Sequence, residues 1–436
     1  MRELRSRLLI AAASVASVLT SVDAQAGGFA IREQSADWLG VSFAGVAAGG
    51  APSSLFWNPA TMTQLPGVSG EINATGILPS SKFASTVSPL LGLVPDSNQN
   101  IADAALAPAI TAIKQINSNT WIGLSVNSPW GLSTSFQDPW PGRFYGLNSN
   151  LRTYNVTPSI AYHVNNWISV GAGFQAQYGS TGLTFGLPAP SPVASTLNLS
   201  GSGWGFGFTA GATLTPLAGT DIGIGYRSAL DQKISGTMGL PSGFPLPGTV
   251  GAISTTLRLP DVVSVGVKQR VSETFTLLGT VEWTNWSRIG TSVIQAAGGP
   301  ATIAGTPVTL PFDYRDGWLF SAGMEYRPAA DWAVRAGVGY EISPVTNAIS
   351  MPEVPDANRV WLSVGLSKTI LPGLSFDVAY AHVFIDNANI NIVPGNPWFS
   401  PLLGAYSGTA SSHIDIFSVG LRLQTPTIAP PLVTKG

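Results

Sequence analysis

The chain has 436 residues, of which 44% are hydrophobic and only 10% are charged, with no cysteine and a formal net charge of -2 at pH 7. A soluble domain has about 25% charged residues, so this composition argues against a soluble surface of this size, and the balanced charge argues against a nucleic-acid partner. The absence of cysteine excludes a disulfide framework and thiolate chemistry.

The first 26 residues have the pattern of a secretory signal peptide. Three arginines precede an apolar run from Leu8 to Val22, and Ala24-Gln25-Ala26 supplies the small residues of a cleavage site. The run is short for a membrane helix. We therefore predict that residues 1–26 are a signal peptide removed before Gly27, with an uncleaved anchor as the alternative.

Residues 27–66 form a segment without strand alternation. Its large apolar side chains, such as Phe29 and Trp38, make it too apolar for a solvated tail. Within it, Asn58-Pro59-Ala60 is typical of a tight stop, because an Asn side chain can bond its own backbone and the residue before Pro is kept out of the helical region. Taken alone, this tripeptide indicates a structural turn.

The rest of the chain shows a period of two residues. In the stretch 167–178, Ile168, Val170 and Phe174 fall on one face, opposite small or polar residues such as Gln175. The stretches 204–214, 274–286, 318–327, 332–341 and 359–367 have the same alternation. No later stretch is long and apolar enough for a membrane helix, so the pattern predicts lipid-facing strands of a β-barrel.

The connections between strands alternate in length. Short polar turns are expected at 116–120, 164–167, 270–274 and 327–331. Long loops rich in Pro, Gly and Ser are expected at 83–105, 133–150, 179–200, 238–254, 287–312, 342–358 and 386–412. Short periplasmic turns and long external loops are the outer-membrane arrangement. We predict an all-β, antiparallel transmembrane barrel of about 14 strands over residues 67–423, followed by a C-terminal tail at 424–436.

A barrel of this size has a lumen wide enough for water unless something fills it. Residues 27–66 are apolar and precede the barrel, so we predict that they form a plug inside it.

The segment from Gly27 to Gly67 resembles the N-terminal hatch of the outer-membrane long-chain fatty acid transporter family (FadL-type), which includes aromatic hydrocarbon transporters. Shared features are an aromatic at the third mature position, the EQSA run and the NPA tripeptide, and residues 138–178, 259–287 and 374–385 are similar to further parts of the family. The resemblance implies a fourteen-stranded, plugged monomeric barrel in the bacterial outer membrane that takes up hydrophobic compounds passively.

The resemblance also implies roles for particular residues. It places Phe29 beside an interior substrate pocket and makes Asn58, Pro59 and Ala60 the anchor of the hatch. The family's third strand has an inward kink that opens the wall, and here that strand reads TWIGLSVNSPWGLSTSF. The residues at the kink, and so at a lateral exit into the outer-membrane lipid, are Asn127, Ser128, Pro129, Trp130 and Gly131. Pro removes a ladder donor and suits a strand break; a simple strand end at the external rim is the alternative.

A hydrophobic cargo agrees with the physics of transfer, since each buried methylene contributes about 0.8 kcal/mol. Long-chain fatty acids are the first candidate and aromatic hydrocarbons the second. A fatty acid carboxylate would need a cation, and by alternation five basic residues face the lumen: Arg258, Lys268, Arg327, Arg335 and Arg422. Such charges are usually partners of carboxylates such as Glu282, Glu325 or Glu341, and the sequence does not choose among them.

Three other functions were weighed against uptake. A general porin would use rings of charge, but the lumen-facing positions are mainly Gly, Ser, Thr and Gln, and a plug would defeat diffusion. A hydrolase needs a nucleophile beside a base, whereas His163, His382 and His413 are far apart in sequence. An adhesin would leave the plug without a use. The sequence contains no metal cluster, phosphate-binding loop or cofactor signature, so no cofactor is predicted.

Overall fold

The structure is a computed structural model that describes residues 28–96, 100–245 and 247–425. The predicted signal peptide and residues 426–436 of the predicted tail lie outside the described residues. No helix in the described part of the chain is long and apolar enough to cross a membrane.

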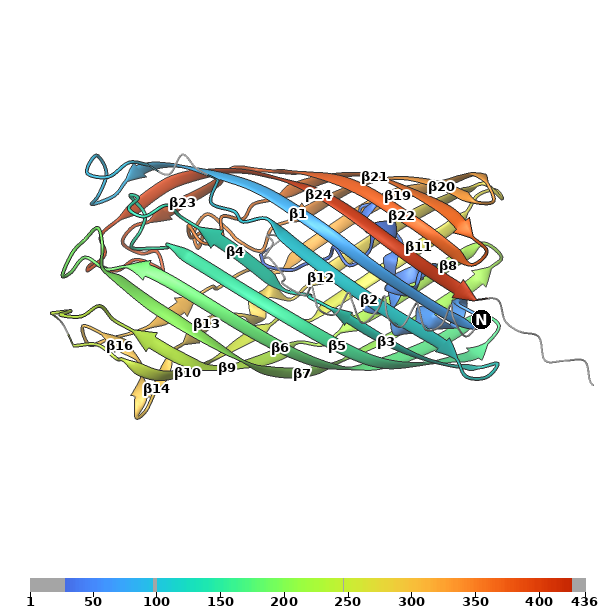
Figure 1. Cartoon of the computed structure of the whole chain (residues 1–436), viewed down its shortest axis with the longest axis horizontal. Coiled ribbons are helices and arrows are strands. Elements are labelled where there is room, and N and C mark those ends of the chain that lie inside the picture. Colours follow the sequence, from blue (N-terminus) through green and yellow to red (C-terminus); the bar gives the residue numbers. More distant parts are fainter. Residues whose placement is uncertain (1–27, 97–99, 246, 426–436) are drawn as a thin grey trace, which may run out of the picture.

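The described chain forms a closed antiparallel barrel whose wall has fourteen strands, which confirms the predicted fold class (Figure 1). In chain order the wall consists of β1 (Val68–Val87), β2 (Ala105–Gln115), β3 (Thr120–Asn127) continued by β4 (Gly131–Ser135), β5 (Asn148–Asn165), β6 (Ile168–Gly186), β7 (Thr196–Leu217), β8 (Thr220–Arg227) continued by β9 (Leu230–Gly239), β10 (Gly251–Leu259) continued by β11 (Val262–Arg270), β12 (Phe275–Thr284), β19 (Gly317–Ala329), β20 (Trp332–Ile342), β21 (Arg359–Leu371), β22 (Leu374–Ile385) continued by β23 (Ala388–Ile392), and β24 (Tyr406–Thr425). β24 pairs with β1 from Val68 to Val87, so the barrel closes without an edge.

The side chains of the wall alternate between the lipid face and the interior. On β6 and β7, Phe174 and Phe206 are more than half exposed, whereas Gln175 and Gln177 are fully buried. This alternation places apolar side chains toward lipid and polar or small ones inside.

The strands extend further into the loops than the sequence indicates. We expected residues 179–200 to be a loop, but β6 continues to Gly186 and pairs there with the start of β7 at Thr196. Backbone pairing does not require lipid-facing apolar side chains, so two strands can stay paired beyond the apolar band. In the segment 286–311, a 3₁₀ helix is followed by short strands: η5 (Trp286–Arg288), β13 (Thr291–Val293), β14 (Gln295–Ala296), β15 (Gly299–Pro300), β16 (Thr302–Ile303), β17 (Thr306–Pro307) and β18 (Thr309–Pro311).

The N-terminal segment, residues 28–66, folds into four short helical turns that lie within the barrel in Figure 1. They are α2 (Ala36–Leu39), η2 (Val46–Ala48), η3 (Pro52–Phe56) and η4 (Pro59–Gln64). Glycines with positive φ flank η2, at Gly45 and Gly49, and keep the turns short. From Gly28 to Met62 every residue except Gly50 is buried, so this segment belongs to the core of the molecule.

Candidate functional site

Asn58, Pro59 and Ala60 lie where the N-terminal segment meets β6 and β7. The Asn58 side chain donates to the carbonyl oxygens of Ala47 at 2.8 Å and of Ala212 in β7 at 2.9 Å. Its Oδ1 accepts from the amide of Ala60 at 3.0 Å, which caps η4 at its start, and Pro59 occupies the first position of the helix, where its missing N–H costs nothing. One buried side chain therefore joins two turns of the segment and one strand of the wall.

The wall accommodates the segment through glycines that face the interior. A Cβ on Gly225 of β8 would collide with the carbonyl oxygen of Trp57, and one on Gly171 of β6 would lie 2.6 Å from the amide nitrogen of Ala60. Backbone thus packs directly on backbone. The inward glycines that the sequence analysis treated as lumen lining are contact points for the N-terminal segment.

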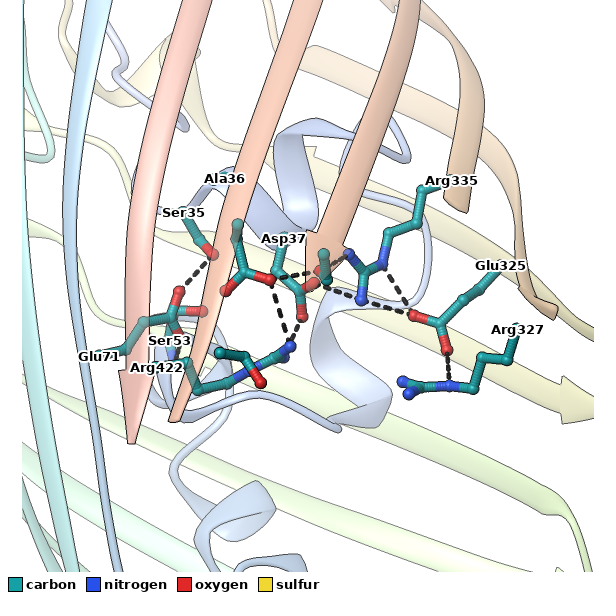
Figure 2. A network of polar contacts seen from close by, with 12 residues as sticks. Ser35, Ala36, Asp37, Ser53, Glu71, Glu325, Arg327, Arg335 and Arg422 are labelled. Carbon is teal, nitrogen blue, oxygen red and sulfur yellow. Dashed lines mark hydrogen bonds and ion pairs between the residues drawn. The ribbon is translucent and has the colours of Figure 1, made fainter. Parts of the chain in front are cut away.

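Charged side chains join the middle of the segment to the wall (Figure 2). The buried Asp37 carboxylate lies 2.6 Å from Arg335 of β20 and 2.7 Å from Arg422 of β24. Arg335 also pairs with Glu325 of β19 at 2.7 Å, and Glu325 with Arg327 at 2.8 Å. Three of the five basic candidates therefore have carboxylate partners and help to hold the segment.

A second ion network lies at Arg32. Its guanidinium contacts Glu282 of β12 at 2.7 Å and Glu341 of β20 at 2.8 Å, and all three side chains are almost completely buried. Breaking a buried pair by removing one partner typically costs about 3 to 5 kcal/mol. Arg32 is therefore fixed to the wall.

One of the five basic residues does not face the lumen. Arg258 is exposed on the outer face of β10, and Leu257 and Leu259 point inward instead. Going from β10 to β11, the inward positions change from odd to even numbers, across the break at Pro260 and Asp261. An extra residue in a strand reverses the facing of every side chain beyond it, so the predicted inward position of Arg258 is wrong.

The third strand is interrupted at Ser128–Trp130, between β3 and β4. Its pairing with β2 ends at Ile110↔Val126, and residues 105–109 of β2 have no ladder partner on that side among the described residues. The start of the N-terminal segment pairs with this break instead: the Ile31 amide donates to the Pro129 carbonyl at 2.8 Å, and the Gly131 amide donates to the Phe29 carbonyl at 2.9 Å. The structure thus brings Phe29 and the kink candidates together.

Phe29 also forms one wall of an apolar cavity that is partly open to the outside. The other lining residues come from strands that include β4, β5, β9 and β10 and from the long loops; among them are Leu132, Leu151, Ile234, Leu257, Met351 and Trp398. The Phe29 ring packs edge-on against Trp286 and Trp130, with ring centroids 4.7 and 6.2 Å away. Because Trp130 belongs to the break in the third strand, the Phe29 ring contacts both the cavity and the break.

Sequence reasoning missed several residues of this region. Glu353, in the connection between β20 and β21, lines the apolar cavity, and Arg227 of β8 lines a second cavity beside Pro129 and Trp130. The Arg227 guanidinium donates to the Phe56 carbonyl at 3.0 Å, and its Cζ lies 4.2 Å from the centre of the Phe56 ring. Glu353 lies in a loop, where the sequence has no periodicity that would indicate a site. Arg227 lies at the end of a regularly alternating strand, and its sequence neighbours do not mark it as a cavity residue.

Two of the three histidines are neighbours in the wall, and His163 lies elsewhere. The Nδ1 atom of His382 is hydrogen-bonded to Asp415 at 2.8 Å, and the His382 ring stacks on His413 with 5.7 Å between ring centres. His163 is hydrogen-bonded to Ser169. Two histidines far apart in sequence are therefore neighbours across β22 and β24, where both side chains are on the outward positions of the wall.

A closed barrel of fourteen strands with apolar side chains outward and an apolar cavity inside defines an outer-membrane transport protein. The family model for the outer membrane protein transport proteins (OMPP1/FadL/TodX) matches residues 17–424, so the chain belongs to that family. This confirms the predicted family, the outer-membrane location and the prediction that the chain is not an enzyme, because these proteins are transport channels for hydrophobic compounds.

Individual relatives agree with this assignment. The chain is 29% identical over 413 residues to the long-chain fatty acid transport protein of Escherichia coli O6:H1, covering 85% of this chain and 90% of that protein. A FadL homologue of Pseudomonas aeruginosa has a similar fold, with a TM-score of 0.82, 23% identity and coverage of 91% and 99%. The toluene transporter TodX of Pseudomonas putida is similar with a TM-score of 0.66, 16% identity and the same coverage.

Proposed function

We propose that the chain takes up long-chain hydrophobic compounds passively across the outer membrane, with fatty acids as the first cargo and aromatic hydrocarbons as the alternative. External loops capture the compound, the cavity beside Phe29 holds it, and the break in the third strand releases it sideways into the lipid. The protein acts as a monomer, and residues 27–66 plug the lumen so that hydrophilic solutes do not leak.

The observation that carries this proposal is the position of Phe29. Its ring forms a wall of the apolar cavity, while its backbone carbonyl accepts from Gly131 at the strand break. A compound in the cavity would therefore contact the same residue, Phe29, that bonds to the break. Transfer along this path keeps the cargo out of bulk water, which favours it by about 0.8 kcal/mol for each methylene.

The plug is supported by the burial of the segment and by its many bonds to the wall. Asp37 and Arg32 are paired with charged residues of the strands, and Asn58 bonds to β7. A general porin would conduct ions in large steady steps through planar bilayers, whereas a plugged channel would not.

Replacing the three break residues with strand formers tests the exit. The triple change Asn127→Thr, Ser128→Val and Pro129→Thr gives position 129 an amide donor and favours continuous pairing. We expect a folded barrel that still binds the cargo but takes it up at least tenfold more slowly. Pro158→Thr, in the unbroken β5, is the matched control and should transport normally. Normal uptake by the triple variant would exclude lateral exit at this strand.

A further inference from the structure

Glu353 is the one acidic or basic side chain among the described residues that line the apolar cavity. It is 1% exposed, and its Oε1 has no hydrogen-bond partner among residues 28–96, 100–245 and 247–425. Its position is fixed, since the hydroxyl of Thr134 donates to its backbone carbonyl at 3.2 Å and a Cβ on Gly146 would lie 2.6 Å from its Cγ. A carboxyl group with one unpaired oxygen is thus held at the wall of an apolar cavity.

No cation in the described part of the chain compensates this carboxyl. The five basic candidates are absent from the cavity lining, and the remaining lining residues are apolar, Gly, Ser or Thr. Burial raises the pKa of Glu353 well above its usual value, because an ionised carboxylate loses its water without gaining a partner. Burial therefore favours the uncharged form of this group, and a protonated carboxyl has one O–H to donate.

We propose that Glu353 selects the cargo by its head group. The cavity binds a long-chain compound whose head is uncharged and carries an acceptor oxygen, such as an alcohol, ketone or ester, in preference to a fatty acid anion. This inference rests on the proposed function and specifies its substrate class. A fatty acid would bind in its protonated form. The apolar lining holds the hydrocarbon body and Glu353 donates to the oxygen.

Two comparisons follow from this arrangement. Compared with an alkane, an alcohol of equal length satisfies the Glu353 O–H, and one neutral hydrogen bond corresponds to about a fivefold gain in affinity. Compared with the alcohol, a carboxylate brings a negative charge into a cavity without a cation, which should weaken binding on the order of 100-fold.

The test measures the binding of octan-1-ol, octanoate and n-octane to the purified full-length protein at about pH 8, where free octanoate is ionised. Intrinsic tryptophan fluorescence is a suitable signal, because Trp398 lines the cavity. We expect octan-1-ol to bind most tightly, n-octane about fivefold more weakly and octanoate on the order of 100-fold more weakly than octan-1-ol.

Three variants separate the role of the carboxyl from a loss of structure. Glu353→Gln keeps a neutral donor and should keep the order of the three ligands. Glu353→Leu removes the donor, so octan-1-ol and n-octane should bind equally. Glu273→Gln, in the short turn between β11 and β12, changes a carboxyl far from the cavity and should behave as the unmodified protein.

The outcomes distinguish this inference from the proposed function. Octanoate binding as tightly as octan-1-ol, or an unchanged preference in Glu353→Leu, would overturn the role of Glu353 while leaving hydrophobic uptake intact. If none of the three ligands binds the unmodified protein, the cavity is not a cargo site and the proposed function fails with it.

Discussion

The hydrogen bonds of Asn58 allow the plug to be tested by one substitution. Asn58→Ala removes two donors and one acceptor, leaving the buried carbonyl of Ala47, the buried amide of Ala60 and the half-buried carbonyl of Ala212 without these partners. Each buried group left unpaired costs about 1 to 3 kcal/mol. At the lower end the two buried groups together cost roughly 2 kcal/mol, so the fraction of displaced segment should rise about 30-fold.

Swelling of liposomes that contain the purified variant measures this displacement through the entry of a small hydrophilic sugar. The barrel should remain folded, because the strand ladders are untouched, and heat-modifiable migration in gels reports this directly. Asn389→Ala is the matched control, since Asn389 is exposed and accepts only a 3.2 Å bond from Thr409. Equal sugar entry for Asn58→Ala and the unmodified protein, with both barrels folded, would refute the anchoring role of Asn58.

Two further predictions concern the same plug. Gly225→Val brings a side chain against the carbonyl of Trp57, so sugar entry should rise at least tenfold in a folded barrel, whereas Gly239→Val, whose Cβ meets nothing within 4 Å, should leave sugar entry unchanged. Burial raises the pKa of Glu33 from 4.5 to about 7. Because the pKa is higher in the folded protein, the protonated group stabilises the fold fully below about pH 4.5. This stabilisation is lost as the pH rises through about 7. Sugar entry should therefore increase over this interval in the unmodified protein and stay constant in Glu33→Gln.

The wall could be predicted from the sequence because its signal is repeated in every strand. A lipid-facing side chain such as Phe174 or Phe206 must be apolar, and its neighbours face inward, so the alternation itself encodes the strand. Strand ends were less predictable: β6 and β7 leave the apolar band before their pairing ends, and beyond the band the side chains no longer need to alternate.

The interior was predictable only where a resemblance supplied it. The contact between Phe29 and the Asn127–Gly131 break was not predicted, and Arg258 faces outward because the break before β11 reverses the alternation. Glu353 gave no signal, since its environment is assembled from strands and loops that are far apart in the sequence. Composition and periodicity describe one strand at a time, whereas a cavity depends on which strands face each other across the barrel.

The bonds of the N-terminal segment divide it into a fixed part and a part with weaker ties. From Arg32 onward, buried ion pairs and the Asn58 bonds hold it to four strands of the wall, which are β7, β12, β20 and β24. Before Arg32, the ties are the backbone bonds of Phe29 and Ile31 to the strand break, the Gly28 amide bond to Asp356 and the packing of the Phe29 ring. Neutral hydrogen bonds contribute about 1 kcal/mol each, less than a buried ion pair costs to break. Under the proposed function, a compound that displaces the Phe29 ring from the cavity would act on the weaker part, and the fixed part would not need to move for the cargo to leave.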